Sequence, residues 1–330
     1  MQVPSNKPAA TSAAAVAAAA AASCTLALLA ALVVAAPAQA QEEQSARVTA
    51  LGVQPGALTG TLAKARKSGS VAIGYRSASV PFSYLSPRGE PIGYSIDICR
   101  AIVERMSQEV DRELTIQWVP VTSATRLAAI IDGKADLECG STTANAEREK
   151  TVAFSPTIFV SGTKLLVRKG SGIRGYRDLG GKTVVVTAGT TNDKALRDVA
   201  KRFNVPLEIV VAKDHDESYA MLESGKVDAF ATDDVLLYGL VATHNARDQL
   251  EVVGDFLSYD PYGIVYRRGD AAMTRLVGAA VQDFAASREL EYTYNKWFTK
   301  QLPSGQRLNL PMSAQLTEML RVMGSDIARE

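Results

Sequence analysis

Short apolar runs alternate along most of the chain with longer stretches in which apolar residues recur at helical spacing. The helix expected over 95–108, for example, begins near Ser95 and places Ile98, Ile102 and Met106 on one face. In this first series the pattern predicts strands at 71–76, 114–121 and 135–140, and helices at 95–108 and 123–136. Strands that alternate with helices in this way are typical of an α/β protein.

A second series of the same kind begins after TKLLVRKGS (163–171). It predicts strands at 183–188, 207–212 and 227–232, with helices at 193–203 and 217–226 between them. The chain then returns with a strand at 262–268 and helices at 271–287, 289–299 and 313–323. We therefore expect two similar α/β lobes, with the amphipathic tail 301–330 packed on the first of them.

The first forty residues consist mainly of Ala, Leu and Val, and Lys7 is the single charge among them. They end in Ala38-Gln39-Ala40, which predicts a secretory signal peptide cleaved after Ala40 and a periplasmic mature protein. A membrane anchor is the alternative, because the apolar run over 13–36 is long enough to span a bilayer. The A-x-A ending and Pro37 favour cleavage.

Charge and cysteine content narrow the function classes. The sequence has 36 basic and 35 acidic residues, so nothing indicates a nucleic-acid or anionic-membrane partner. Cys99 and Cys139 remain after cleavage, and in an oxidising compartment they either form a disulfide or stay as two buried thiols. With two histidines and no zinc-like spacing, no metal is implied, and no cofactor is expected.

The stretch ECGSTTANAEREK (138–150) places three hydroxyls and Arg148 directly after a predicted strand. Hydroxyls, backbone N–H groups and a guanidinium at such a place can bind a carboxylate. The alternative is a helix N-cap followed by a solvated arginine. A second glycine-containing stretch, GGKT (180–183), lacks the first glycine of a phosphate-binding loop and precedes a strand, so we exclude a nucleotide site.

Five segments together resemble a known family. They are GYRSASVPFSYLSPRGEPIGYSIDICRAI, VTSATRLAAIIDGKADLECGSTTANAEREKTVAFSPTIFVSGTKLLV, LGGKTVVVTAGTTNDKAL, AKDHDESYAMLESGKVDAFATDDVLL and YDPYGIVYRR. The chain over 70–300 resembles the periplasmic solute-binding proteins of ABC transporters for polar amino acids, family 3, and within them the glutamate/aspartate-binding branch. The resemblance implies the type II periplasmic-binding-protein fold, with two α/β lobes and two crossover hinge segments near 160–166 and 258–264.

Domain boundaries follow from this resemblance. We expect a signal peptide at 1–40, an N-terminal lead-in at 41–69, a first lobe of 70–162 and 263–330, and a second lobe of 163–262. A monomer that closes on its ligand and delivers it to a membrane permease is the implied behaviour.

The resemblance also implies the roles of ten residues. Ser141, Thr143 and Arg148 would hold the α-carboxylate of an amino acid, and Asp233 its α-ammonium, assisted by Thr190 and Thr191. The side-chain carboxylate of glutamate or aspartate would be held by Arg76, Ser123, Arg126 and His215. Counting full charges, three arginines face one aspartate, which suits a ligand with two carboxylates and one ammonium.

Two alternatives belong to other function classes. A cyclohexadienyl dehydratase-like enzyme on the same scaffold would need a general acid at the leaving group, whereas Asp233 is committed to an ammonium. A sensory module would need a signalling domain, and none follows residue 300 in the sequence. The expected protein is therefore a binding protein and not an enzyme.

Overall fold

Two five-stranded sheets organise the computed structural model, which describes residues 58–325. The predicted signal peptide lies outside the described residues. The order in the first sheet is β5 (Thr115–Pro120), β1 (Ser70–Tyr75), β6 (Leu137–Glu138), β15 (Val265–Arg267), β7 (Val152–Phe154). The order in the second is β11 (Glu208–Ala212), β10 (Thr183–Thr187), β12 (Ala229–Asp233), β9 (Thr163–Arg168), β13 (Leu250–Val253).

Each sheet has the same mixed pairing. In the first, β1 lies between parallel neighbours β5 and β6, and β15 runs antiparallel to β6 and β7. In the second, β10 lies between parallel neighbours β11 and β12, and β9 runs antiparallel to β12 and β13. Central strands such as β1 and β12 are buried over most of their length, which explains the apolar runs with which they are built.

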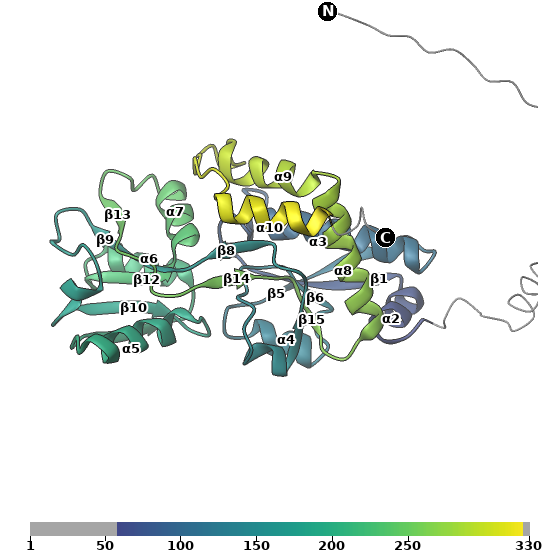
Figure 1. Ribbon diagram of the computed structural model, residues 1–330, viewed down its shortest axis with the longest axis horizontal. Helices are drawn as coiled ribbons and strands as arrows, with labels where there is room; N and C mark the ends of the chain where they lie inside the picture. Colours follow the sequence, from purple (N-terminus) through teal and green to yellow (C-terminus); the bar gives the residue numbers. More distant parts are fainter. Residues whose placement is uncertain (1–57, 326–330) are drawn as a thin grey trace, which may run out of the picture. The chain divides into compact units, whose positions relative to one another are not determined.

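Two short strands join the lobes. β8 (Phe159–Ser161) enters the second lobe, β14 (Asp260–Tyr262) leaves it, and they pair antiparallel (Figure 1). A small three-stranded sheet on the first lobe contains β2 (Ala78–Ser79), β3 (Ser83–Leu85) and β4 (Pro91–Ile92). The chain therefore crosses between the lobes twice, and the two crossovers lie side by side.

The helices surround both sheets. They are α2 (Gly60–Ser68), α3 (Tyr94–Glu109), α4 (Arg126–Ile131), α5 (Asn192–Phe203), α6 (His215–Glu223), α7 (Asp234–Thr243), α8 (Ala271–Ala286), α9 (Glu289–Tyr294) and α10 (Ala314–Ser325). Single turns occur at Arg148–Lys150 and Tyr176–Leu179, and a π-helical turn at Asn295–Thr299 follows α9. None of the helices in residues 58–325 has both the length and the apolar character needed to cross a bilayer.

The structure differs from the sequence prediction at α2, α4 and α6. The lead-in contains α2, which contacts α8 and β1. Helix α4 is much shorter than the predicted 123–136, because Thr122 and Thr125 exchange hydrogen bonds between each backbone N–H and the other hydroxyl, and Gly133 at φ 73° ends the helical stretch. Ser123 is consequently not a cap. Helix α6 begins two residues earlier than predicted, because Asp214 accepts a hydrogen bond from the Glu217 N–H and caps it.

Helix α7 was missed for a physical reason. Its sequence DVLLYGLVAT is apolar on nearly all sides, so it lacks the amphipathic period that identifies a surface helix. Val235 and Leu236 pack in the core of the first lobe, whereas Leu237, Leu240 and Val241 pack in a core of the second. The helix is thus apolar all round because both lobes contact it.

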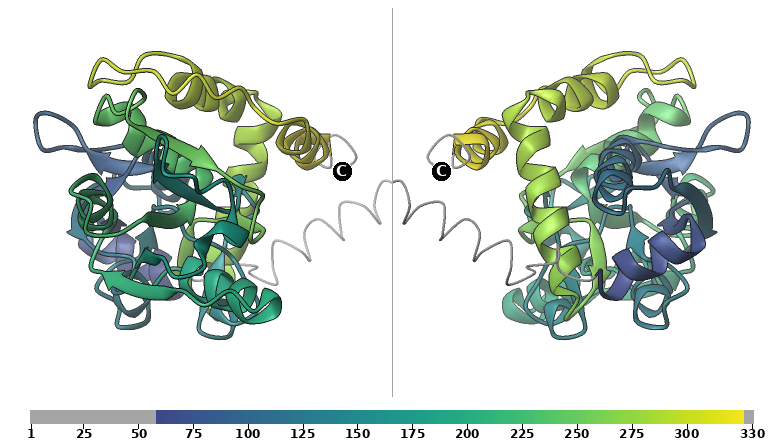
Figure 2. Two further views of the ribbon diagram at one scale, coloured as in Figure 1. Left: turned by 90° about the vertical axis from the view of Figure 1, so that its left-hand side faces the viewer. Right: turned by 90° about the vertical axis from the view of Figure 1, so that its right-hand side faces the viewer.

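The C-terminal helices belong to the core of the first lobe. Leu316 and Leu320 of α10 are buried with Met273 and Val277 of α8. Figure 2 shows α10 beside α8 in both views. As far as residue 325, the tail packs on the first lobe as predicted.

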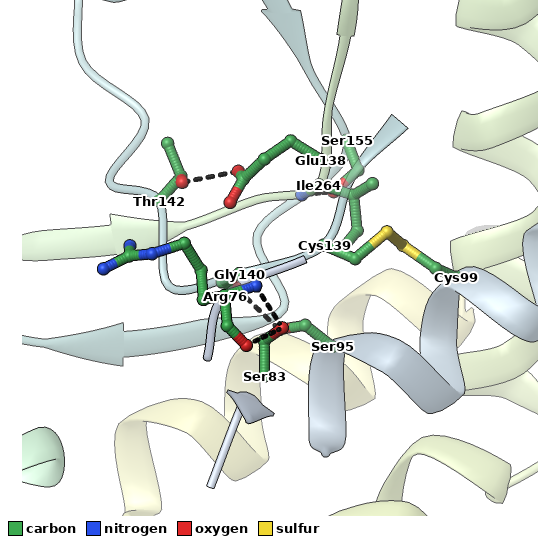
Figure 3. The surroundings of a disulfide bond; sticks show 10 residues. All are labelled: Arg76, Ser83, Ser95, Cys99, Glu138, Cys139, Gly140, Thr142, Ser155 and Ile264. Carbon is green, nitrogen blue, oxygen red and sulfur yellow. Dashed lines mark hydrogen bonds between the residues drawn. A yellow bond between two sulfur atoms is a disulfide. The ribbon is translucent and has the colours of Figure 1, made fainter. Parts of the chain in front are cut away.

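A disulfide bond joins Cys99 of α3 to Cys139, the residue after β6 (Figure 3). Both cysteines are fully buried. The Ser95 hydroxyl also donates to the Gly140 carbonyl at 2.8 Å, so two links attach the start of the 140–143 loop to α3. This loop contains two of the predicted ligand-binding hydroxyls.

Replacing both cysteines by serine is expected to lower the free energy of unfolding by about 4 kcal/mol. The bond closes a loop with a sequence separation of 40 residues, and the loss of its constraint on the unfolded chain accounts for this value. Denaturant unfolding of the double variant, compared with oxidised and reduced wild type, measures the difference. A loss below about 1 kcal/mol would contradict the expectation.

Candidate functional site

A small cavity lies where the carboxyl ends of strands from both sheets meet. Residues that follow β6, β10 and β12 contribute to it, as is general for ligand sites in α/β sheets. The cavity has a volume of about 10 Å³, about the space of one water molecule, so the lobes must separate before an amino acid can enter. Eight of the ten predicted residues line it, together with Asn192 and Leu236: Ser123, Arg126, Ser141, Thr143, Thr190, Thr191, His215 and Asp233. Arg76 and Arg148 are not among the lining residues.

Arg76 lies directly after β1 and is almost fully buried. Its backbone N–H donates to Ser83 Oγ at 2.9 Å, which fixes the start of the side chain. Its Nη1 has no hydrogen-bond partner among residues 58–325. Burial, together with the charge of Arg126, lowers the pKa of Arg76 to about 9. A buried guanidinium with an unused donor favours an anion next to it.

Arg126 is the first residue of α4 and is equally buried. Its Nη1 donates to the Ser141 carbonyl at 3.2 Å, and its Nε has no partner in the described part of the chain. The Ser123 hydroxyl nearby is also buried, and residues 58–325 give it no partner. Burial lowers the pKa of Arg126, although the charge of Glu138 opposes this. One end of the cavity is therefore positive and has unused donors.

Arg148 connects the two lobes. Its Nη1 donates to the Thr143 carbonyl at 2.9 Å, and its Nη2 donates to the Gly189 carbonyl of the second lobe at 3.1 Å. Burial lowers its pKa to about 10. The hydroxyls of Thr143 and Thr191 lie 3.4 Å apart across the same boundary. Ser141 is buried beside them, so hydroxyls form a second polar group in the cavity, and Arg148 is hydrogen-bonded to one of the residues that carry them.

Glycine 189 explains how closely the lobes approach here. It has φ 73°, and a Cβ at this position would lie 2.5 Å from Ala124 Cα and 2.6 Å from the Ser123 carbonyl oxygen. Only glycine fits this contact without displacement of the backbone. The lobes are thus in contact around the cavity, which accounts for its small volume.

Asp233 ends β12 and is almost fully buried. It accepts a hydrogen bond from Asn192 Nδ2 at 2.8 Å and another from the Tyr262 hydroxyl. Burial raises the pKa of Asp233, and the nearby charge of Asp260 raises it further. Thr191 donates to Asp260 at 3.0 Å, whereas the Thr190 hydroxyl donates to the Thr187 carbonyl at 2.7 Å. This end of the cavity is negative.

Four residues around the site were not predicted from the sequence: Asn192, Tyr262, Asp260 and Glu138. Asn192 directly follows the predicted pair Thr190-Thr191, and the other signal was the polar crossover sequence YDPYG, which contains Asp260 and Tyr262. The buried carboxylates of Asp260 and Glu138 correct the earlier charge count. The three arginines are balanced by three carboxylates, those of Asp233, Asp260 and Glu138. The positions of the charges within the site therefore matter more than its net charge.

His215 is the first residue of α6 and is buried. Its Nδ1 lies 2.9 Å from Thr187 Oγ1, which in turn lies 2.8 Å from Ser218 Oγ. Burial lowers its pKa well below the ordinary value, and the charges of Arg76 and Arg126 lower it further. The imidazole is therefore neutral at pH 7. Asp214 caps the helix and Asp216 lies in its first turn, so the sequence Asp-His-Asp does not form a cluster.

Acid is expected to destabilise the ligand-free protein through His215. The unfolded chain takes up a proton on this histidine below pH about 6.5, whereas the folded protein does not, so stability is lost as pH falls from there. His215→Gln should reduce the slope of unfolding free energy between pH 6.5 and 5 by up to about 1.4 kcal/mol per pH unit. Denaturant unfolding at a series of pH values measures it, with His244→Gln as the control for loss of a histidine. Equal slopes in wild type and His215→Gln would refute the assignment.

The described residues contain no candidate metal-binding site. Within residues 58–325, no group of three or more His, Cys, Asp and Glu side chains is arranged to hold a metal ion. The cavity instead combines a positive end, a central group of hydroxyls and a negative end. This arrangement suits a small zwitterion with an additional carboxylate.

Two lobes linked by two crossovers around such a cavity define a two-lobed solute-binding protein. Residues 71–300 match the model of the bacterial extracellular solute-binding proteins, family 3, and the chain belongs to this family. It is 45% identical over 266 residues to an L-glutamate/L-aspartate-binding protein of Pseudomonas aeruginosa, covering 80% of this chain and 88% of that protein. A glutamate/aspartate import solute-binding protein of Escherichia coli is 38% identical over 264 residues, covering 80% and 86%.

A solved structure supports the same fold. The chain is similar to an ancestral amino-acid-binding protein described as a precursor of cyclohexadienyl dehydratase, with 27% identity and a TM-score of 0.63. The similarity covers 73% of this chain and all of that one. The type II periplasmic-binding-protein fold implied by the sequence is thereby confirmed.

Proposed function

We propose that the protein captures L-glutamate or L-aspartate between its lobes and delivers it to the membrane permease of an ABC transporter. One observation supports this most strongly: a single small cavity has unused buried donors of Arg126 and Ser123 at one end and the carboxylate of Asp233 at the other. The similarity to glutamate/aspartate-binding relatives agrees with it.

The side-chain carboxylate of the ligand would occupy the positive end. Arg76 and Arg126 supply guanidinium donors, Ser123 supplies a hydroxyl, and neutral His215 supplies a ring nitrogen. A neutral side chain would leave buried guanidinium groups without an anion, which costs about 3–5 kcal/mol. Glutamate and aspartate differ by one methylene, worth about 1–3 kcal/mol, so both belong to the proposed ligand class.

The α-amino-acid group would occupy the rest of the cavity. Ser141, Thr143 and Arg148 bind its carboxylate, and Asp233 binds its ammonium with help from Thr190 and Thr191. An ammonium beside Asp233 offsets the repulsion between this carboxylate and Asp260. Because Arg148 also bonds the second lobe, ligand binding and lobe closure would stabilise each other.

Delivery to a permease requires lobes that move about a hinge and a protein located in the periplasm. We infer a first lobe of 70–162 and 263–330 and a second lobe of 163–262, with β8 and β14 in the two hinge segments. The first lobe also includes α2 from the lead-in. The mature protein would be a periplasmic monomer released by cleavage after Ala40.

A cyclohexadienyl dehydratase-like enzyme is the second candidate, because the chain shares its fold with an ancestral precursor of that enzyme. Its general acid would have to come from Asp233, which already accepts hydrogen bonds from Asn192 and Tyr262. We therefore propose binding without catalysis. Turnover of prephenate or arogenate by the purified protein would overturn this part of the proposal.

A thermal-unfolding series tests the ligand class. A ligand that binds only the folded protein raises the melting temperature. Glutamate and aspartate should raise it, whereas glutamine, asparagine and arginine should raise it far less at the same concentration. An equal or larger shift with arginine or a neutral amino acid would contradict the proposal.

A further inference from the structure

A buried carboxylate lies behind the positive end of the cavity. Glu138 is the last residue of β6 and pairs with Gly74 of β1. Gly140 and Arg76 lie two residues beyond this pair, just after the ends of β6 and β1. Figure 3 shows the Glu138 and Arg76 side chains directed to the same side, away from the Cys99–Cys139 disulfide.

Gly140 allows these two side chains to lie over it. A Cβ at this position would be 2.3 Å from Glu138 Oε1 and 2.9 Å from Arg76 Cγ. The absence of a side chain at Gly140 thus places the carboxylate and the arginine stem against the same backbone atom.

Glu138 has few direct partners. It is fully buried, and its Oε2 accepts a hydrogen bond of 2.6 Å from the Thr142 hydroxyl. Its Oε1 has no partner, and it forms no ion pair with any basic side chain in residues 58–325. A buried carboxylate held this way acts on its surroundings through charge more than through contact.

The affected groups are the arginines of the site. Burial lowers the pKa of Arg76, and the charge of Glu138 opposes that effect there as it does at Arg126 and Arg148. Arg76 and Arg126 repel each other, since the charge of Arg126 lowers the pKa of Arg76. Glu138 therefore offsets the repulsion within a pair of buried cations.

We infer that Glu138 determines charge specificity: it neutralises one of the two cations at the side-chain end of the cavity, and so limits how strongly a carboxylate is preferred there over a neutral amide. This inference rests on the proposed function. Glu138 stabilises the ligand-free arginine pair, and it also repels the incoming carboxylate. Removal of its charge would increase the repulsion between the two arginines in the ligand-free protein, and it would also remove the repulsion of the incoming carboxylate.

The test compares glutamate with glutamine in Glu138→Gln. Glutamine at 138 keeps the shape and an oxygen that accepts the Thr142 hydrogen bond. The Kd for glutamate is expected to fall about tenfold while that for glutamine changes little. The ratio of the glutamine Kd to the glutamate Kd therefore rises about tenfold. The ligand-free melting temperature should fall. An unchanged or smaller ratio would overturn the inference.

Two further variants separate charge from shape. Glu138→Asp keeps the charge and should leave the ratio within about threefold of wild type, a reading that remains available if Glu138→Gln does not fold. A tenfold change in Glu138→Asp would assign the effect to shape and refute the inference. Glu149→Gln removes an exposed carboxylate from the neighbouring turn and should leave the ratio unchanged. Absence of glutamate binding by wild type would instead refute the proposed function, and the inference with it.

Discussion

Arg148→Ala is expected to weaken glutamate binding about a thousandfold, or about 4 kcal/mol. The substitution removes the guanidinium proposed for the α-carboxylate. It also removes the hydrogen bonds to the carbonyls of Thr143 and Gly189, the second of which joins the lobes. Calorimetric titration of the variant measures the change in Kd.

Two comparison variants make this result specific. Arg148→Lys keeps the charge without the planar fork and should bind with intermediate affinity. Arg174→Ala removes an exposed arginine of the second lobe and should bind as wild type. A loss below about threefold in Arg148→Ala would exclude Arg148 from the binding site.

Asp233→Asn is expected to weaken glutamate binding about a hundredfold and to raise the melting temperature of the ligand-free protein. Binding weakens because the ammonium loses its anion. Stability rises because the folded protein raises the pKa of Asp233, so the ionised carboxylate destabilises the folded state at neutral pH. Titration calorimetry and thermal unfolding measure the two effects on one sample.

The expected loss of affinity and gain of stability distinguish Asp233→Asn from a variant with a damaged fold. A variant that merely damaged the fold would lose both affinity and stability. Asp248→Asn, at an exposed position, should change neither. Unchanged affinity in Asp233→Asn would show that another group binds the ammonium.

Much of the fold could be predicted because local pattern and tertiary structure agree. The helix expected over 193–203 is observed as α5 (Asn192–Phe203), and that expected over 271–287 is observed as α8 (Ala271–Ala286). Both are amphipathic surface helices, for which the apolar period is informative. Helix α7 carried no such period, since apolar cores of both lobes surround it.

The site was only partly accessible from sequence. Hydroxyls and arginines that follow strands could be identified, because the ends of neighbouring strands meet at one edge of a sheet. The Tyr262 hydroxyl that donates to Asp233 is 29 residues away along the chain, and Asp260 comes from the same crossover. Glu138 lies inside a predicted strand, and the local sequence did not indicate that its carboxylate would be buried near the arginines of the site. Such long-range partners depend on the lobe arrangement, which a local pattern does not contain.

The cysteines illustrate the same limit. Sequence left open whether Cys99 and Cys139 were bonded, since a secreted chain can also bury two free thiols. Their pairing depends on the position of α3 beside the end of β6. That position follows from the packed lobe and not from the spacing of the two residues.

One cavity is expected to bind one acidic amino acid. Isothermal titration calorimetry of the mature protein, stripped of carried-over ligand by unfolding and refolding, tests it most directly with glutamate, aspartate, glutamine and arginine. We predict tight one-to-one binding of glutamate and aspartate and far weaker binding of the other two. A folded protein that binds neither acidic amino acid, or that prefers arginine or glutamine, would contradict the account.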